Sequence, residues 1–305
     1  MSKLITVFGA TGNQGGSVVR AILNDPALSR EFKIRGITRD VSKPAAQALA
    51  AKGVEVVAAD MGSIELAAPA VAGAHTVFMV TNYWENPSGD GEIAQGKAVT
   101  DACKAAGVKH LIFSSLINVS EVSGGRLTHI HHFDGKAKIE QYIRGSGVPA
   151  TFVLPGLFMS NLFTMIRNNG EGAYSLNLPV TPDKGQVPLF NAGGDLGKFV
   201  NAALRHYPSS IGKRIYAATE YYTPSRIMSE FSEVMGKPAT FNQISEEAFK
   251  TGRPPALAQE MLENMLLLDD PGYYGGADLK ESLDLLTEKP TTWKEFVETY
   301  KEKWL

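Results

Sequence analysis

The chain has 305 residues, of which 44% are hydrophobic and 20% are charged, and its formal net charge is −2. This composition is typical of a globular protein with a large core, and the lack of a strongly basic segment argues against direct nucleic-acid binding. The single cysteine, Cys103, excludes an internal disulfide, and no apolar run reaches the roughly 20 residues that span a bilayer, so we expect a soluble protein of the cytoplasm, with the nucleus as a second location and no membrane partner.

Strand and helix patterns alternate through the first half of the chain. Short apolar runs predict strands at residues 4–8, 33–38, 54–58, 75–80, 109–114 and 150–154. Helical patterns lie between them at residues 15–23, 44–51, 92–106 and 133–144. Repeated strand–helix units with nearly continuous apolar strands predict an α/β fold of the Rossmann type, a doubly wound parallel sheet with helices on both faces.

The alternation ends after Pro155, where glycine, proline and asparagine become frequent. The second half mixes short strand-like and helical pieces, at residues 186–190, 196–204, 214–218 and 224–235. An amphipathic segment closes the chain, with Thr291 or Thr292 as its N-cap. We therefore expect a dinucleotide-binding domain over residues 1–155 and a smaller α/β lobe over residues 156–305, some of whose strands rejoin the main sheet.

The segment GATGNQGG joins the first predicted strand to the first predicted helix. Gly9 allows a tight exit from the strand, Gly12 lets the backbone approach a pyrophosphate, and Gly15 lets the helix pack on the strand. Free N–H groups and the positive end of the helix dipole then face the phosphates. The spacing and its position therefore predict a bound dinucleotide.

The end of the second predicted strand indicates which dinucleotide binds. An NAD site usually has a carboxylate there for the ribose 2′-hydroxyl, whereas this strand ends in Ile37-Thr38-Arg39, with Lys43 within reach. A guanidinium is suited to a phosphate, which a carboxylate repels. We therefore expect NADP(H), with Asp40 as the residue that serves an NAD ribose if the loop bends the other way.

Residues that follow the third and fourth strands belong to the same edge of the predicted sheet, where ligands bind. Asp60 is placed to accept a hydrogen bond from the adenine amine, and Met61 to cover the ring. Thr81 and Asn82 follow the fourth strand, where the chain passes toward the nicotinamide.

Four segments of the chain resemble the NmrA-like family, an atypical branch of the short-chain dehydrogenases/reductases: GATGNQGGSV, VTNYWE at 80–85, GRLTHIHHFDGK at 125–136 and LPGLFMSNLF at 154–163. The likeness is greatest to the NADPH-sensor branch known as HSCARG, and it is strong to about residue 163. It implies a Rossmann lobe, a smaller lobe and a cleft between them. It also implies a regulatory role through protein partners, because the founding member is a negative regulator that binds a transcription factor.

The resemblance adds cofactor contacts to those predicted from the loop and the strand ends. The full set that we expect is Gly9, Ala10, Thr11, Gly12, Asn13, Gln14, Gly15, Arg39, Lys43, Asp60, Met61, Thr81, Asn82, Tyr83, Lys136, Gly156, Phe158 and Asn161.

The catalytic pattern of the superfamily is incomplete in this chain. Active short-chain dehydrogenases usually carry Tyr-x-x-x-Lys on one helical face, but here Lys136 is preceded by His132 at the tyrosine position. Beside a cationic lysine the pKa of an imidazole falls below about 6.5, so a proton donor is scarce at neutral pH. Lys136 either binds the nicotinamide ribose or is itself the acid/base, as the lysine of isoflavone-reductase-like members implies. Lys136 and His132 are thus the candidate catalytic residues.

Neighbouring histidines and serines have simpler interpretations. His129, His131 and His132 do not predict a metal site, because no cysteine or carboxylate stands at a supporting spacing. Ser114 and Ser115 occupy the place of the usual catalytic serine, and we expect them to be solvated residues at a strand end.

Two functions remain open at this point. The missing tyrosine favours a redox-state sensor that binds a regulatory protein partner according to the NADPH/NADP ratio. The retained lysine favours an NADPH-dependent reductase of a small carbonyl, quinone or enone, with an apolar cleft formed by Leu157, Phe158, Met159 and Phe163. A sealed face opposite the nicotinamide favours the first function, and an open apolar pocket beside Lys136 favours the second.

Overall fold

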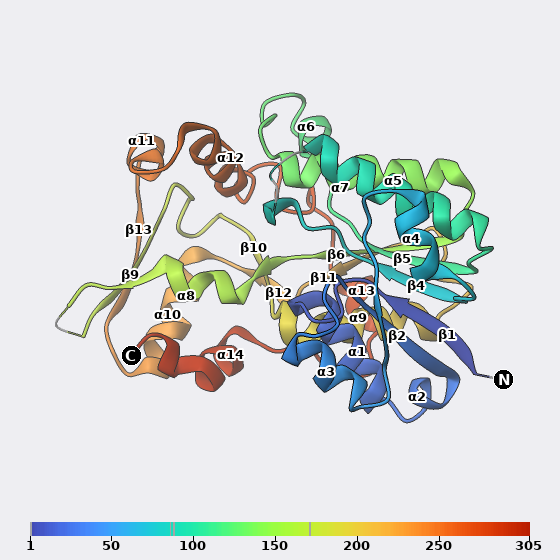
Figure 1. Ribbon diagram of the computed structural model, residues 1–305. Helices are drawn as coiled ribbons and strands as arrows, with labels where there is room; N and C mark the ends of the chain where they lie inside the picture. The colour runs from blue at the N-terminus through green and yellow to red at the C-terminus, as the bar shows by residue number, and fades with distance from the viewer. Residues whose placement is uncertain (1, 86, 88, 171) are drawn as a thin grey trace.

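The computed structural model describes residues 2–85, 87, 89–170 and 172–305. Within these residues a seven-stranded parallel sheet has the order β11-β6-β5-β4-β1-β2-β3 (Figure 1). Its strands are β1 (Lys3–Val7), β2 (Phe32–Thr38), β3 (Glu55–Ala58), β4 (Thr76–Met79), β5 (His110–Ser114), β6 (Ala150–Pro155) and β11 (Arg214–Ala217). The order reverses between β1 and β4, so the predicted doubly wound Rossmann-type fold is confirmed.

Helices cover both faces of this sheet. In the first half they are α1 (Asn13–Asn24), α2 (Leu28–Glu31), α3 (Pro44–Ala50), α4 (Ile64–Val71), α5 (Gly89–Ala105), α6 (Val119–Val122) and α7 (His131–Ser146). Alternate residues of each strand belong to two apolar cores: Val77 and Met79 pack with α4, α5 and α7, whereas Phe78 packs with α1. The strands are therefore buried on both sides, which explains their continuous apolar sequence.

Helix α9 (Ala192–Arg205) comes from the second half of the chain but packs against α1 of the first. Gly197 makes the close approach possible, since a Cβ there would lie 2.3 Å from the Cβ of Ala21 and 2.4 Å from the carbonyl oxygen of Ser17. The N–H of Gly197 donates to Ser17 Oγ at 3.0 Å, and Asn201 Nδ2 donates to the carbonyl of Ala21 at 3.1 Å. With β11 paired to β6, residues from both halves build the sheet layer.

The rest of the second half lies beyond the carboxyl ends of the main strands (Figure 1). It contains two small sheets, β12-β10-β7 and β13-β9-β8. Their strands are β7 (Leu157–Phe158), β8 (Ile166–Asn168), β9 (Tyr174–Leu178), β10 (Val187–Phe190), β12 (Glu220–Tyr222) and β13 (Ala239–Gln243). The accompanying helices are α8 (Leu162–Met165), α10 (Pro224–Met235), α11 (Glu246–Lys250), α12 (Pro255–Leu266) and α14 (Trp293–Tyr300). Helix α13 (Lys280–Asp284) instead packs against β11 of the main sheet, where Ser282 Oγ accepts a hydrogen bond from the N–H of Tyr216 at 2.9 Å.

The last helix begins as the sequence predicts. Thr292 is the N-cap of α14, and a capping box joins it to Glu295. Trp293 is buried and its ring lies 6.0 Å from that of Trp304, so the chain end closes the apolar centre of this half. In the described part of the chain, no helix combines the length and the apolar character that crossing a membrane requires.

Candidate functional site

The turn from β1 into α1 is a closely packed backbone loop. Gly9 has a φ of +64°, a conformation that side chains with a Cβ rarely adopt. A Cβ on Gly15 would lie 2.2 Å from the carbonyl oxygen of Gly9, and a Cβ on Gly12 would lie 3.3 Å from the same atom. Glycine at these positions therefore lets the start of α1 pack closely against the end of β1.

The start of α1 is suited to an anion. Gly12 is the N-cap, its position has no side-chain cap hydrogen bond, and none of the described residues in the first turn is acidic. N–H groups at such a start have no intrahelical partner, and the helix dipole favours negative charge beside them. The loop and the helix start together fit the pyrophosphate of a dinucleotide.

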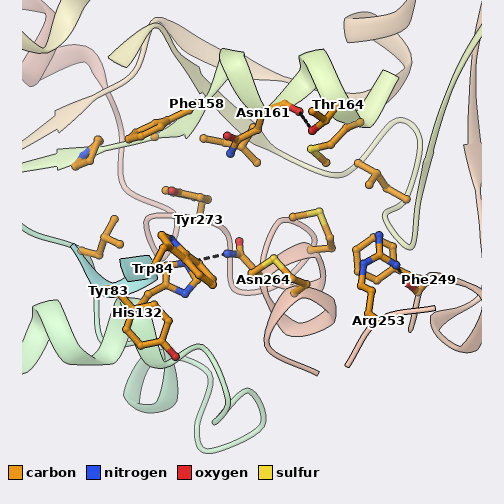
Figure 2. A pocket seen from close by; sticks show the side chains of 18 of the residues that line it. Tyr83, Trp84, His132, Phe158, Asn161, Thr164, Phe249, Arg253, Asn264 and Tyr273 are labelled. Atoms are coloured by element: carbon orange, nitrogen blue, oxygen red, sulfur yellow. Dashed lines mark hydrogen bonds between the residues drawn. The ribbon is translucent and has the colours of Figure 1, made fainter. Parts of the chain in front are cut away.

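Residues from several segments meet at the carboxyl edge of the sheet. Gln14 follows β1, Thr81 and Asn82 follow β4, and Gly156 follows β6. They line one cavity of about 800 Å³ together with the other predicted residues Tyr83, His132, Lys136, Phe158 and Asn161. Figure 2 shows Phe158 and Asn161 on one wall and Tyr83 and His132 on the wall opposite.

The residues predicted for the adenosine end lie outside this cavity. Since β2 and β3 follow β1 in the sheet, Arg39, Lys43, Asp60 and Met61 come to the side of the glycine loop away from β4. The remaining loop residues, Ala10, Thr11 and Asn13, belong to the turn from β1 into α1. A molecule that contacts both groups must extend across the loop, as a dinucleotide does in this fold.

Arg39 has a partner that the sequence analysis missed. Its guanidinium, with a side chain 66% exposed, pairs with the carboxylate of Glu85 on η1 (Tyr83–Glu85), whose side chain is 46% exposed. Asp40 instead bonds within its own loop, where its Oδ1 accepts hydrogen bonds from the N–H of Ser42 at 2.9 Å and from the hydroxyl of Ser42. The cation therefore faces outward near the carboxyl end of β2.

Lys136 is held by a buried carboxylate. Its Nζ donates to Glu92 Oε1 of α5, and the hydroxyl of Thr81 donates to the same oxygen at 2.6 Å. The side chains of Lys136 and Glu92 are 11% and 2% exposed, so the ion pair is almost fully desolvated. Glu92 Oε2 is buried without a hydrogen-bond partner among the described residues. The pair fixes the ammonium at the cavity wall.

His132 and Tyr83 share a second carboxylate, that of Glu260 on α12. His132 Nδ1 donates to Glu260 Oε1 at 2.6 Å, and the phenol of Tyr83 donates to Oε2 at 3.0 Å. His132 Nε2 accepts from Asn264 Nδ2 at 3.0 Å, so these partners assign the neutral imidazole with its proton on Nδ1 (Figure 2). Glu260 thereby couples the tyrosine of one wall segment to the histidine of α7.

Burial sets the protonation of this pair of side chains. It lowers the pKa of His132 below its ordinary value, while the hydrogen bond and charge of Glu260 oppose that effect and Lys136 adds to it. Burial also raises the pKa of Tyr83, and Glu260 raises it further. Both groups are therefore neutral at physiological pH, and Lys136 is the cation of the inner wall.

Beyond these polar groups the cavity is lined by apolar side chains. They come from η1, β7, α8, β9, α11, α12 and the loops between these elements: Trp84, Leu116, Leu157, Met165, Leu178, Ile244, Phe249, Met261, Met265 and Tyr273. The Trp84 ring lies 4.9 Å from that of His132, which joins the polar and apolar parts of the wall. The space beside Lys136 is thus open and largely apolar.

The NmrA-like family profile matches residues 1–297. The chain belongs to the NmrA-like family. It is 33% identical over 260 residues to the NmrA-like family domain-containing oxidoreductase ptmS of Penicillium ochrochloron, covering 79% of this chain and 76% of that protein. It is 30% identical over 313 residues to the oxidoreductase FrzB of a Cladobotryum species, covering 96% and 92%.

Solved structures share the fold of this NmrA-like chain. The negative transcriptional regulator NmrA superposes with a TM-score of 0.84 at 22% identity, covering 98% of this chain and 96% of that one. The triphenylmethane reductase of Citrobacter sp., in complex with NADP(H), gives a TM-score of 0.76 at 23% identity over 98% and 99%. The fold thus occurs both in a regulator and in a reductase.

Two expectations about this NmrA-like chain were wrong. Ser114 and Ser115 are buried, not solvated, because Ser114 Oγ donates to Gln14 Oε1 and Ser115 Oγ donates to the buried Glu140, each at 2.7 Å. Met159 and Phe163 are absent from the described lining of the cavity. Met159 lies in the core, and the Phe163 ring packs 4.9 Å from that of Trp304.

The spacing of two glutamates in the sequence is compatible with their role as partners of two histidines. Glu260 and Glu263 stand three residues apart on α12, as His129 and His132 do at the start of α7, and the pairs match: His132 with Glu260 and His129 with Glu263. Each of these two histidines is thus engaged with a separate carboxylate. Among the described residues, no three histidine, cysteine or acidic side chains are placed to hold a metal ion.

Proposed function

We propose that this NmrA-like chain binds NADP(H) and reduces a small-molecule carbonyl, quinone or enone. The observation that carries the proposal is the open apolar cavity of about 800 Å³ beside Lys136, which reaches Gln14 of the glycine loop. A nucleotide in that loop would direct its nicotinamide toward this cavity, and the apolar part beyond Lys136 would remain for a substrate. Curated relatives such as ptmS and FrzB are named oxidoreductases, which supports the same class.

The choice of NADP(H) rests on the loop and on Arg39. The glycine loop and the start of α1 accept a pyrophosphate, and the exposed guanidinium of Arg39 is available for the 2′-phosphate. Asp40 already accepts hydrogen bonds from Ser42, so it is less available to a ribose hydroxyl. NmrA is solved in complex with NADP and with NAD, and the triphenylmethane reductase in complex with NADP(H), so these structures support a dinucleotide in this fold, while the preference for NADP(H) rests on Arg39.

Residues of the chain supply the electrostatics of the reaction. When bound, the cofactor provides a hydride to the substrate. Lys136 presents a positive charge to the substrate oxygen on which negative charge develops, and Glu92 and Thr81 hold the ammonium in place beforehand. Lys136 is also the proton donor in this proposal, because neutral His132 directs its proton to Glu260 and not to the cavity.

The test measures NADPH oxidation across a panel of carbonyl, quinone and enone compounds. Replacing Lys136 with Met should lower kcat about 10²–10⁴-fold, the range of a lost acid–base group. The control is Lys138→Met, which alters an exposed lysine on the same helix and should leave turnover unchanged. Tight NADPH binding without turnover of any compound in the panel would reject the reductase.

A second function, redox-state sensing through a regulatory protein partner, has one observation in its favour. The Arg39–Glu85 pair joins the adenosine side of the site to η1, whose Tyr83 and Trp84 line the cavity. A 2′-phosphate that takes Arg39 would release this segment, yet NADPH and NADP both carry that phosphate. Sensing therefore requires a further difference between the two bound forms. Hydrogen exchange of residues 80–85 that is identical with NADPH and NADP would count against it.

A further inference from the structure

The charged residues that line the cavity are all of one sign. Lys136, Arg167 and Arg253 contribute to the lining, and no aspartate or glutamate does so among the described residues. Lys136 has its counter-charge in Glu92, directly behind the wall. Neither arginine forms an ion pair with any residue that the structure describes.

Arg253 lies at the end of the cavity away from the reactive groups. It belongs to the turn between α11 and α12, and Figure 2 shows it beside Phe249, far from Tyr83 and His132. Its guanidinium stacks 4.3 Å from the centre of the Phe249 ring and donates to the carbonyl oxygen of Phe249. These contacts orient the guanidinium and leave further N–H groups for a ligand.

The wall between the two ends suits an apolar ring system. Met261 and Met265 of α12 line the cavity with Met165, and unbranched thioethers adapt to the outline of a ligand. The rings of Phe158 and Tyr273 add flat apolar surface (Figure 2). From Lys136 to Arg253 the cavity thus offers a reactive end, an apolar middle and a cationic far end.

We propose that the cavity takes an elongated apolar molecule with a carboxylate at one end, bound by Arg253, and its reducible group at the other end beside Lys136. The inference rests on the proposed function, because it assigns the cavity to the substrate. An arginine fork matches a carboxylate through two parallel hydrogen bonds, and the apolar middle rejects a second charge. Arg167, on β8, adds positive charge to the same cavity.

The test compares two probes of equal shape, biphenyl-4-carboxylate and biphenyl-4-carboxamide, in calorimetric titrations of the NADP-loaded protein. The carboxylate should bind about tenfold more tightly than the amide. In Arg253→Gln this preference should disappear, whereas Arg253→Lys should keep part of it. The matched control is Arg30→Gln, because Arg30 also donates to a carbonyl four residues earlier, at 2.7 Å, on an exposed surface. That variant should bind both probes as the unchanged protein does.

Equal binding of the two probes by the unchanged protein would overturn the carboxylate site, and so would failure of both to bind. An equal loss for both probes in Arg253→Gln would also overturn it, since the arginine would then only support the wall. The readout does not depend on turnover. If the protein prefers the carboxylate probe but oxidises NADPH with no compound of the panel, the reductase is rejected and the carboxylate site is kept. If it reduces neutral compounds but shows no preference for the carboxylate probe, the carboxylate site is rejected and the reductase is kept.

Discussion

The contact between Arg39 and Glu85 allows the cofactor preference to be tested from both partners. Exposed ion pairs contribute about 0–1 kcal/mol, and these side chains are 66% and 46% exposed. A charge-assisted contact to a 2′-phosphate is worth about 1.5–3 kcal/mol, and the lower half of that range applies at so exposed a site. Arg39→Gln should therefore weaken NADPH binding about 10–30-fold and leave NADH within about twofold. Glu85→Gln removes the competing carboxylate and should strengthen NADPH binding by up to about fivefold.

Both variants are assayed by calorimetric titration with NADPH and with NADH at one low ionic strength, since salt screens an exposed contact. The two cofactors differ only in the 2′-phosphate, so NADH is an internal control for damage to the glycine loop. Equal losses for NADPH and NADH in Arg39→Gln would refute the assignment of Arg39. Weaker NADPH binding in Glu85→Gln would refute the idea that Glu85 and the phosphate compete for one guanidinium.

Buried charges and tight backbone contacts give three further predictions. Lys136→Met should lower the free energy of unfolding, measured in urea, by about 3–5 kcal/mol, because it leaves Glu92 buried without its cation. The double variant Lys136→Met/Glu92→Gln should recover most of this stability, and no recovery would contradict a direct pairing of the two side chains. Gly15→Ala should lower the free energy of unfolding by at least about 3 kcal/mol and abolish NADPH binding, since its Cβ would lie 2.2 Å from a backbone oxygen. Gly145→Ala, with open space around its Cβ, should instead raise stability by about 0.5–1 kcal/mol, and equal shifts in Tm for the two variants would contradict this reasoning. Burial lowers the pKa of His110 from 6.5 to about 4, so the unfolded chain takes up this proton first as pH falls, and about 3 kcal/mol of stability should be lost between pH 6.5 and pH 4. In urea unfolding, the stability of His110→Asn should depend less steeply on pH over this range, and an unchanged pH dependence would refute the assignment.

The strands of the main sheet could be predicted because the local sequence of each one shows an apolar pattern. Nearly continuous apolar runs such as 111–113 and 150–154 are typical of strands that are buried on both faces. Helix α4 escaped prediction because Pro69 lies inside it and its sequence, IELAAPAV, has little polar face. The two small sheets escaped because β7 has two residues and β8 three, too few for a periodic pattern.

The same distinction applies to the site. Residues at strand ends, such as Thr81 and Asn82, follow from topology, because parallel strands end at one edge. Their carboxylate partners come from elsewhere: Glu92 is 44 residues from Lys136, and Glu260 is 128 residues from His132. Contacts over such separations depend on how helices pack; the matching three-residue spacing of the histidines on α7 and the glutamates on α12 is compatible with their pairing but does not show that the two helices meet. The open cavity itself was foreseen only as one of two alternatives.

The exchange of elements between the two halves has a consequence for how the molecule can be handled. Strand β11 covers the edge of β6, and α9 covers the outer face of α1 through the Gly197 contact. A fragment ending at residue 155 would expose an unpaired strand edge and an apolar helix face, both of which promote aggregation. Helix α1, which begins at the glycine loop, therefore packs against residues that are translated much later, so the first half of the chain completes its packing only after α9 and β11 have been made.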